Sequence, residues 1–442
     1  MRRLNVFVDQ QLVGQLQEGA GLWTFAYEEA WSRAAHSFDI SPALPRSQAV
    51  HTDGGTMRPV QWFFDNLLPE EDLRKAIARE AEIRDSQDAF AMLEYLGAES
   101  AGSLTLLPPD AQLPRTVEVR ELSDAELSAR IANLPRSTLA REAPKRMSVA
   151  GAQHKLLVVL RQDRLFEPVG ATPSTHILKP DHPKAETYPV SAFNEFLTMR
   201  LAAAAKLTVP AVYLRYVPQP VYIIERFDRM VPRRQVGDAP PAVRRLHVLD
   251  ACQLLNRDRL YKHTGATLQA LKDIIDACNN KAATRQALFR WLVFNVVVGN
   301  DDSHLKNLSF HSDAEGVRLA PHYDLLCTGA YHTKAIADAA GYWPDVPMTF
   351  RLPGARTFAQ VTRESLIEAA QELKLPAKVA ERILDDVAAR VDREFALIAA
   401  EHERLVAQAS PEQVLDLQMQ SRLLRIIGHI VLEEMLRKVR AG

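Results

Sequence analysis

A cluster of polar residues separates an apolar helix from a short strand in the C-terminal half of the chain. The run Trp291–Val298 is apolar, and Leu308–Phe310 has the composition of a strand. Several polar side chains stand between them, among them Asp301, Asp302, Lys306 and Asn307. Burying such groups costs free energy unless a ligand or metal ion uses them. The segment therefore predicts a binding site where a buried helix ends.

The spacing within this segment is typical of phosphoryl transfer. Asp302 precedes Asn307 by five residues. In kinase catalytic loops an Asp at this spacing orients or deprotonates the acceptor hydroxyl, and the Asn binds Mg²⁺. Lys306 is expected to neutralise charge on the migrating phosphoryl group. Asp324, seventeen residues after Asn307, is predicted to be the second Mg²⁺ ligand, because Mg²⁺ prefers oxygen ligands and needs few from the protein.

A second set of residues precedes the catalytic segment and is predicted to hold ATP. The loop Ser148–Lys155 is rich in small residues and opens a strand, which lets backbone N–H groups approach phosphates. Lys179 ends the next strand and is expected to hold the α- and β-phosphates, with Glu195 as its ion-pair partner. The segment Glu225–Phe227 is predicted to be the hinge beside adenine. The residues that we expect to contact the nucleotide are Ala150, Gly151, Ala152, Gln153, His154, Lys155, Lys179, Glu195, Glu225, Arg226, Phe227, Asp302, His304, Asn307 and Asp324.

The order of predicted elements indicates a mixed α/β (α+β) protein with four parts. We expect an N-terminal subdomain over 1–107, a connector over 108–145, a small β-rich lobe over 146–230 and a helical catalytic lobe over 231–442. The predicted strands are 4–8, 11–16, 103–107, 155–161, 176–179, 211–217, 221–227, 308–310 and 317–319. The predicted helices are 73–82, 86–96, a short one opened by Ser123, 192–205, 268–278, 284–298, 363–374, 376–402 and 418–439. Residues 231–246, rich in Pro and Arg, are predicted to be a surface loop.

Several motifs, in order along the chain, resemble those of the HipA-type bacterial toxin kinases. They are Asp65–Pro69, Leu96-Gly97 with Gly102, Ser148–Lys155, Glu225–Arg229, Leu246–Gln253, Asp302–Asn307 and His322–Asp324. The last hundred residues carry no distinctive motif. The resemblance implies a bilobal, protein-kinase-like fold with an added N-terminal subdomain.

The resemblance also implies an activity and partners. The activity would be phosphorylation of Ser or Thr in a translation-related protein such as an aminoacyl-tRNA synthetase, leading to growth arrest and persistence. Ser148 would be an autophosphorylation site that switches the kinase off. A small helix-turn-helix antitoxin (HipB-like) would bind the chain, and operator DNA would be contacted mainly through that antitoxin.

Some alternatives stay open at this point. Asp301 replaces a residue that is often small in the family, so Asp301 and Asp302 can in principle exchange roles; the spacing to Asn307 favours Asp302. His304 and His322 are expected to brace their loops through hydrogen bonds. A kinase-fold co-repressor and a small-molecule phosphotransferase are the rival functions. The absence of a G-x-S-x-G elbow and of a Walker A lysine argues against a hydrolase and a P-loop NTPase.

Composition excludes little but fits a cytoplasmic enzyme. The formal net charge is −1, so nothing demands nucleic acid or an anionic membrane as a direct partner. The three cysteines include no C-x-x-C pair, which argues against a zinc site or disulfide framework and fits a reducing compartment. The start of the chain alternates like a strand and lacks the apolar block of a signal peptide.

Overall fold

The computed structural model describes residues 1–148, 150–231, 243–411 and 413–441. The chain divides into two units, each assembled from separate segments. The first unit comprises Met1–Lys179, Ile224–Tyr261 and Ser309–Ala320, and the second comprises Pro180–Ile223, Lys262–Leu308 and Pro321–Gly442. Residues 232–242, within the predicted surface loop 231–246, lie outside the described residues.

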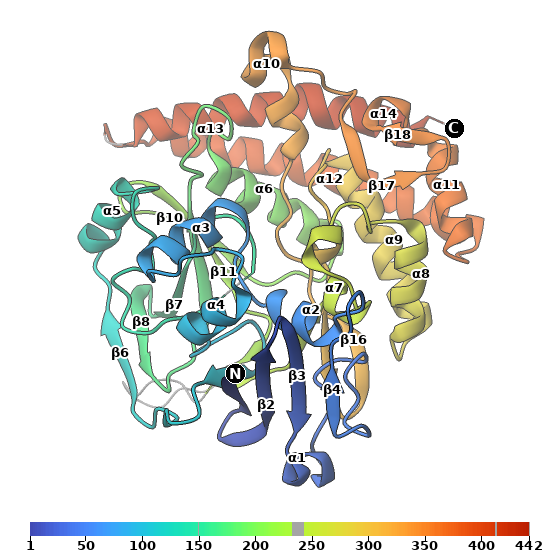
Figure 1. The fold of residues 1–442 in the computed structure, drawn as a ribbon. Helices are drawn as coiled ribbons and strands as arrows, with labels where there is room; N and C mark the ends of the chain where they lie inside the picture. The colour runs from blue at the N-terminus through green and yellow to red at the C-terminus, as the bar shows by residue number, and fades with distance from the viewer. Residues whose placement is uncertain (149, 232–242, 412, 442) are drawn as a thin grey trace. The chain divides into compact units, whose positions relative to one another are not determined.

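The first unit begins with an antiparallel sheet of order β4-β3-β2-β1-β5 (Figure 1). Its strands are β1 Arg2–Val8, β2 Gln11–Gly19, β3 Leu22–Tyr27, β4 Val50–Thr52 and β5 Leu104–Leu107. The predicted hairpin is confirmed: Val8 pairs with Gln11, and Asp9 takes a left-handed turn conformation (φ 51°). Alternate residues such as Leu4 and Val6 are fully buried, as the period-2 pattern requires. The helices of this part are α1 Glu29–Arg33, α2 Pro59–Asp65, α3 Glu71–Glu80 and α4 Ala89–Leu96.

The remaining strands of the first unit form a larger sheet region and two small sheets. Strands β6 Val117–Glu121, β8 Arg164–Gly170, β7 Leu156–Arg161 and β9 His176–Pro180 are neighbours in that order. The predicted connector therefore contains a strand, β6, which pairs with β8. The connector also holds α5 Asp124–Ala132, where Ser123 accepts a hydrogen bond from the Glu126 amide as the predicted cap. The smaller elements are β12 Arg229–Met230, β13 Arg244–Arg245, β14 Val248–Asp250, α7 Ala251–Leu254, η1 Arg259–Tyr261, β15 Ser309–Asp313 and β16 Gly316–Leu319.

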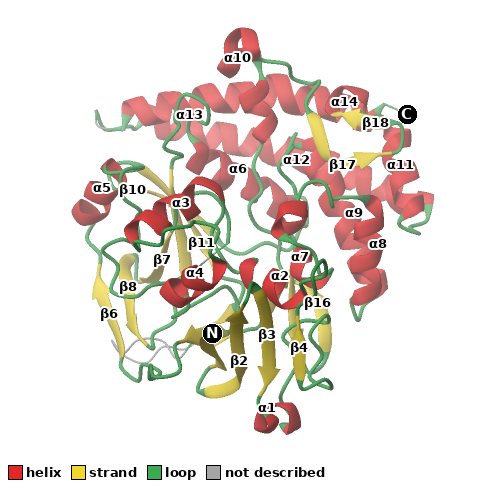
Figure 2. Cartoon of the chain, viewed as in Figure 1, coloured by secondary structure: helices red, strands yellow, loops and turns green. Residues whose placement is uncertain are grey.

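The second unit is mainly helical, and helices dominate its part of Figure 2. Its long helix α12 (Ala377–Ala407) packs against α6 Ser191–Ala204, α9 Lys281–Val297, α11 Arg363–Glu372, α13 Val414–Ile426 and α14 Glu433–Arg440. Strands β10 Val212–Tyr216 and β11 Pro220–Glu225 follow α6, and β11 ends beyond the limit of the unit. The remaining elements are α8 Leu268–Ala277, η2 Leu305–Asn307, η3 Thr328–His332, α10 Lys334–Ala337, η4 Asp338–Ala340, β17 Pro347–Leu352, β18 Ala355–Thr357, η5 Phe358–Gln360 and η6 Ile427–Leu432.

Most predicted helices differ from the structure only in their bounds, but one also differs in its internal geometry. The helix expected over 418–439 begins earlier, at Val414, and its middle turn η6 is a π-helix. Gly428 lies in that turn, and a Cβ there would come within 2.6 Å of the Phe395 ring of α12. The close approach of this ring to the backbone is the local packing feature that accompanies the wider turn. None of the helices in the described part of the chain combines the length and the apolar composition that spanning a bilayer requires.

Candidate functional site

The predicted catalytic loop begins directly after α9. The last turns of α9 are buried, and Val298 precedes Gly299, which has a φ of 64°. A Cβ on Gly299 would lie 2.7 Å from Trp343 and 2.8 Å from Val431. Both the backbone conformation and the crowding therefore require glycine here. The chain leaves the buried helix at this residue and enters the polar loop.

The two adjacent carboxylates of the loop have different surroundings. The side chain of Asp302 is 60% exposed, whereas that of Asp301 is 23% exposed and lies 3.2 Å from Nε2 of His332. The main chain of Asp301 is fixed as well: its amide donates to Thr328 Oγ1 at 2.8 Å, and its carbonyl accepts from Thr349. Asp301 thus anchors the loop, and Asp302 presents its carboxylate to solvent. This contrast favours Asp302 over Asp301 as the predicted catalytic residue, as the spacing to Asn307 does.

Asn307 closes the loop onto Asp302. Its side-chain Nδ2 donates to the Asp302 carbonyl at 2.9 Å, and the His304 amide donates to the same carbonyl at 2.9 Å. These bonds fix the position of the Asp302 backbone and orient the Asn307 amide group. Lys306 is buried, with 6% exposure. That Lys306 neutralises charge on the migrating phosphoryl group stays a prediction.

The turn that carries Asp324 is joined to the same loop. Tyr323 donates its hydroxyl to the Lys306 carbonyl at 2.7 Å, and Asp324 has a φ of 58°. His322 is buried and stacks on Trp291, and its amide donates to the Thr208 carbonyl at 2.8 Å. Burial lowers the pKa of His322 to about 4, so its ring is neutral near pH 7. These contacts support the predicted bracing role of His322.

Helix α6 brings Glu195 close to the Asp324 turn. Burial is the main reason that the pKa of Tyr222 lies well above its usual range, and the charges of Glu195 and Asp324 raise it further. Both carboxylates therefore lie near one buried phenol. The preceding residue, Asn194, exchanges two hydrogen bonds with the main chain of Cys327, at 2.8 and 3.1 Å. Helix α6 and the segment that follows Asp324 are thus tied together.

The Ser148 loop lies in the first unit, where motifs of the N-terminal subdomain bind it. The Ser148 amide donates to the Glu99 carbonyl at 2.7 Å, and its hydroxyl donates to the Leu67 carbonyl at 2.7 Å. Ser148 is only 1% exposed. Gly151, with a φ of 112°, accepts a hydrogen bond from the Glu70 amide at 3.1 Å. The loop is therefore held by Leu67 within the Asp65–Pro69 motif, by Glu70 directly after that motif, and by Glu99.

The Lys155 side chain crosses the same loop. Its Nζ donates to the Ala150 carbonyl at 2.6 Å, and a Cβ on Gly151 would lie 2.8 Å from this Nζ. Ala152, Gln153 and His154 complete the loop, and burial lowers the pKa of His154. Lys179 is buried at the end of β9. Lys179 belongs to the first unit and Glu195 to the second, so their pairing stays a prediction.

A buried network of charges joins the Glu225–Arg229 motif to Glu99. Arg229 donates to the Glu99 carboxylate at 2.9 Å, and Lys145 does so at 2.8 Å. Arg226 forms two bonds with Asp228, at 2.9 and 2.7 Å. Burial alone would raise the pKa of Glu99, but the charges of Lys145, Arg229 and Arg226 outweigh it and hold that pKa well below its usual range.

This network changes the interpretation of the predicted hinge. The Arg226 side chain is buried among the charges, and its amide donates to the Thr175 carbonyl at 2.9 Å. Arg226 therefore has a structural role that the sequence analysis did not foresee. Phe227 packs edge-on against His311 with ring centroids 6.0 Å apart. The predicted contact of Glu225 and Phe227 with adenine stays a prediction.

Sequence reasoning also missed three residues near the predicted site. Glu99 follows the Leu96-Gly97 motif, but only the fold brings it to Ser148. His332 and His263 lie far from Asp301 and Asp302 along the chain, and neither stands in a motif that would have identified it. Nε2 of His263 lies 3.9 Å from Oδ1 of Asp302.

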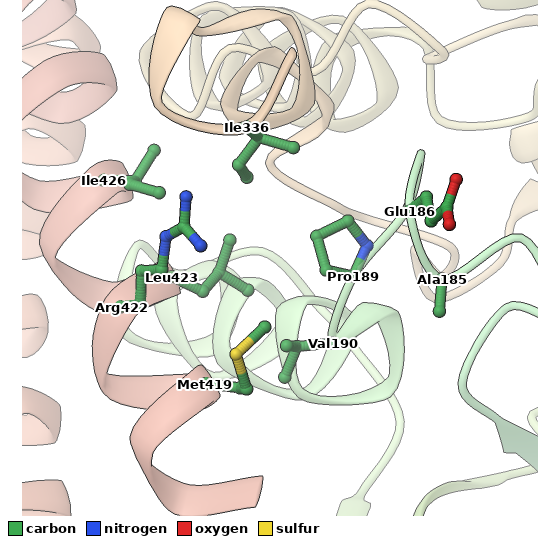
Figure 3. Close-up of a pocket in the computed structure, with 9 residues that line it drawn as sticks. All are labelled: Ala185, Glu186, Pro189, Val190, Ile336, Met419, Arg422, Leu423 and Ile426. Carbon is green, nitrogen blue, oxygen red and sulfur yellow. The ribbon is translucent and has the colours of Figure 1, made fainter. Parts of the chain in front are cut away.

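A pocket of the second unit lies apart from the residues predicted to be catalytic. Its volume is about 190 Å³, and its walls come from the segment before α6, from α10 and from α13 (Figure 3). The lining residues are Ala185, Glu186, Pro189, Val190, Ile336, Met419, Arg422, Leu423 and Ile426. None of them was predicted to bind ATP or Mg²⁺. Its lining is largely aliphatic, which does not suit the charged phosphates of a nucleoside triphosphate.

Comparisons with known proteins agree with the motifs. The HipA N-terminal domain matches residues 4–107, and the HipA-like C-terminal domain matches residues 147–395. The chain is 36% identical to "Putative kinase Y4mE" of Sinorhizobium fredii over 75% of this chain and 78% of that protein. It is 30% identical to "Serine/threonine-protein kinase toxin HipA" of Shewanella oneidensis over 74% of this chain and 76% of that protein.

A solved structure shares the fold. It is a chain of the Shewanella oneidensis toxin–antitoxin complex of HipA, HipB and operator DNA, with a TM-score of 0.75 and 24% identity. The alignment covers 96% of this chain and 97% of that one. The expected mixed α/β, protein-kinase-like fold is thereby confirmed. The chain belongs to the HipA family of serine/threonine protein kinases.

Proposed function

We propose that this kinase transfers the γ-phosphoryl group of ATP to a Ser or Thr hydroxyl of a translation-related protein, and also to its own Ser148. The observation that carries the proposal is the hydrogen-bonded loop in which Asn307 is tied to the backbone of the exposed Asp302. Asp302 orients the acceptor hydroxyl and accepts its proton. Catalysis of this kind depends on positioning and electrostatics more than on covalent chemistry.

The residues of the second unit fit a magnesium–nucleotide complex. When bound, Mg²⁺–ATP would supply the phosphoryl group and a divalent cation that offsets the negative charge of the phosphates. Asn307 and Asp324 offer oxygen ligands, which Mg²⁺ prefers. The bond from Tyr323 to the Lys306 carbonyl keeps the two ligand segments together. Lys306 supplies positive charge, and Glu195 adds a buried carboxylate near Asp324.

The residues of the first unit supply the proposed nucleotide contacts. Backbone amides of residues 150–155 approach the phosphates, Lys179 holds the α- and β-phosphates, and Glu225–Phe227 lie beside adenine. Ser148 becomes an acceptor only after its hydroxyl leaves the Leu67 carbonyl, because it is 1% exposed in the bound position. Phosphorylation there adds a charge that this buried site cannot hold, so the loop no longer covers ATP and the kinase switches off.

The proposed biological role is that of a toxin in a type II toxin–antitoxin module. Support comes from the family and from the neighbouring structure, which contains HipA, HipB and operator DNA. A HipB-like helix-turn-helix protein is the proposed partner, and operator DNA is bound mainly through it. Gel filtration of this chain with a candidate antitoxin and an operator fragment tests the partnership. A ternary complex is expected, and separate elution of the chain contradicts it.

The metal assignment is tested with radiolabelled ATP and the purified full-length chain. Asp324→Asn is expected to raise the Mg²⁺ concentration needed for half-maximal transfer and to lower the maximal rate, because one ligand oxygen is lost. Asp338→Asn is the matched control, since Asp338 is also an aspartate with positive φ (49°) in the second unit. Equal Mg²⁺ dependence of the two variants would contradict the assignment. Label on a small molecule alone would instead indicate a small-molecule phosphotransferase.

A further inference from the structure

Three potential metal ligands meet beside the catalytic loop. One ligand atom each from His263, Asp302 and His304 lies within 4.8 Å of the other two. No other trio of His, Cys, Asp or Glu in the described part of the chain was found to approach in this way. The group comes from two separate segments, a turn after η1 and the catalytic loop. None of its three members is among the residues that we assign to Mg²⁺, although one of those, Asn307, donates a hydrogen bond to the Asp302 carbonyl.

The two segments are already joined. The Leu305 amide donates to the Lys262 carbonyl at 3.1 Å, directly beside His263 and His304. The rings of His263 and His304 meet edge to face, with centroids 4.8 Å apart and planes at 80°. His304 is buried, while the side chains of His263 and Asp302 are 48% and 60% exposed. The cluster thus has one buried ligand, His304, and two exposed ligands that an ion from solvent can reach.

We propose that His263, Asp302 and His304 form a binding site for a transition-metal dication of the Zn²⁺ class. Two imidazoles and one carboxylate suit Zn²⁺, whereas Mg²⁺ takes carboxylate, carbonyl and water oxygens. Zn²⁺ bonds of about 2.0–2.1 Å place tetrahedral ligand atoms roughly 3.4 Å apart. The ligand atoms lie within 4.8 Å of one another, so they need to approach by at most about 1.4 Å, a movement to which rotation of the exposed His263 side chain contributes. A water molecule completes the tetrahedron.

The proposed ion inhibits the kinase. This part rests on the proposed function, because it requires Asp302 to be the base. A carboxylate bound to Zn²⁺ is a much weaker proton acceptor toward the acceptor hydroxyl, because the cation withdraws negative charge from it. Excess Mg²⁺ does not relieve the block, because imidazole nitrogens bind Mg²⁺ poorly.

Zinc binding can be measured without any activity assay. The metal-free full-length protein is titrated with Zn²⁺ against a chromophoric chelator, in excess Mg²⁺. The wild type is expected to take up one ion that is lost, or weakened at least about tenfold, in His263→Ala and in Asp302→Asn. His36→Ala is the matched control, because His36 is also an exposed histidine outside helices and strands. Equal Zn²⁺ affinity in the wild type and His263→Ala would overturn the site.

Two further readouts separate this inference from the proposed function. Co²⁺ is expected to give visible d–d absorption in the wild type and His36→Ala but not in His263→Ala, and equal spectra overturn the site. In the kinase assay, Zn²⁺ should inhibit the wild type, chelator should restore it, and His263→Ala should need at least about tenfold more Zn²⁺. Full Zn²⁺ sensitivity in an active His263→Ala protein contradicts the inhibitory role. Zinc uptake through His263 in a protein without transfer activity supports the site and refutes the proposed function alone.

Discussion

The fold gives the adjacent residues Asp301 and Asp302 different surroundings. Asp301 holds His332, Thr328 and Thr349, so its carboxylate and main chain are engaged within the protein. Asp302 is fixed through its backbone and is the more exposed of the two carboxylates. Fixed backbone and accessible side chain are what a general base needs.

Asp302→Asn is expected to lower the turnover of phosphotransfer by about 10²–10⁴-fold, because proton handling by a positioned carboxylate contributes about this much. Asp301→Asn keeps an oxygen that can accept from His332, so a much smaller loss is expected. The measurement is initial rates at saturating ATP for both variants. The reverse order of effects would show that the two residues have exchanged roles.

Ser100 has an environment similar to that of Ser148. Each is 1% exposed, and each donates its hydroxyl to a main-chain carbonyl at 2.7 Å, Ser148 to Leu67 and Ser100 to Leu104. Either change to Ala should destabilise the fold by about 1 kcal/mol, the usual contribution of one such bond. Only Ser148→Ala is expected to abolish self-phosphorylation, as measured by phosphopeptide mapping. Phosphate elsewhere on the chain in Ser148→Ala, at the wild-type level, would refute this site.

At the scale of elements, Glu99 links the N-terminal subdomain to the Ser148 loop. Its carbonyl holds the Ser148 amide, and its carboxylate binds Arg229 and Lys145. Glu167 is a useful comparison, since it is equally buried but is paired with Arg120 and Arg130 and not with any described residue of the Ser148 loop. Comparing substitutions of the two glutamates therefore separates the loss of stability caused by removing a buried charge from the effect on the Ser148 loop.

Glu99→Gln and Glu167→Gln should each lower the free energy of unfolding by about 3–5 kcal/mol, because each leaves buried cations without their partner. Glu99→Gln alone is expected to speed hydrogen exchange at the Ser148 amide and to increase self-phosphorylation. Urea unfolding and hydrogen-exchange mass spectrometry measure the two effects. Equal protection of the Ser148 loop in both variants would show that Glu99 does not hold it.

At the scale of the whole molecule, buried neutral histidines predict sensitivity to acid. Burial lowers the pKa of His176 and of His247 to about 4. In the unfolded chain these groups titrate near 6.5. The unfolded state therefore binds more protons between these values, so stability falls as the pH decreases from about 6.5 toward 4.

Because of each of these two histidines, the free energy of unfolding should be roughly 1–2 kcal/mol lower at pH 5 than at pH 7. Chemical unfolding at both pH values measures the change. His247→Gln should reduce the difference between the two pH values, while His36→Ala, at an exposed position, should leave it unchanged. An undiminished difference in His247→Gln would contradict the role of His247.

The parts of the molecule that local pattern governs were predictable. The β1–β2 hairpin, the Ser123 cap, α6, α8 and α9 follow from periodicity and turn chemistry, and the Asp302–Asn307 spacing identified the loop. Strand β6 was missed although Val117–Glu121 alternates between apolar and polar residues, because the run is short and mostly exposed and lies in a segment rich in Pro and charged residues. The Glu99 network, the Asp301–His332 pair and the approach of His263 to Asp302 join residues far apart in sequence. Such contacts depend on tertiary packing, which no local window contains.

We propose that Asp302 is the base of this kinase and that Ser148 accepts phosphate from ATP. The decisive experiment is intact mass spectrometry of the purified full-length protein after incubation with Mg²⁺–ATP. We expect one added phosphate on the wild type and none on Asp302→Asn or Ser148→Ala. An unmodified wild type, or an equally phosphorylated Asp302→Asn purified and assayed alone, would contradict it.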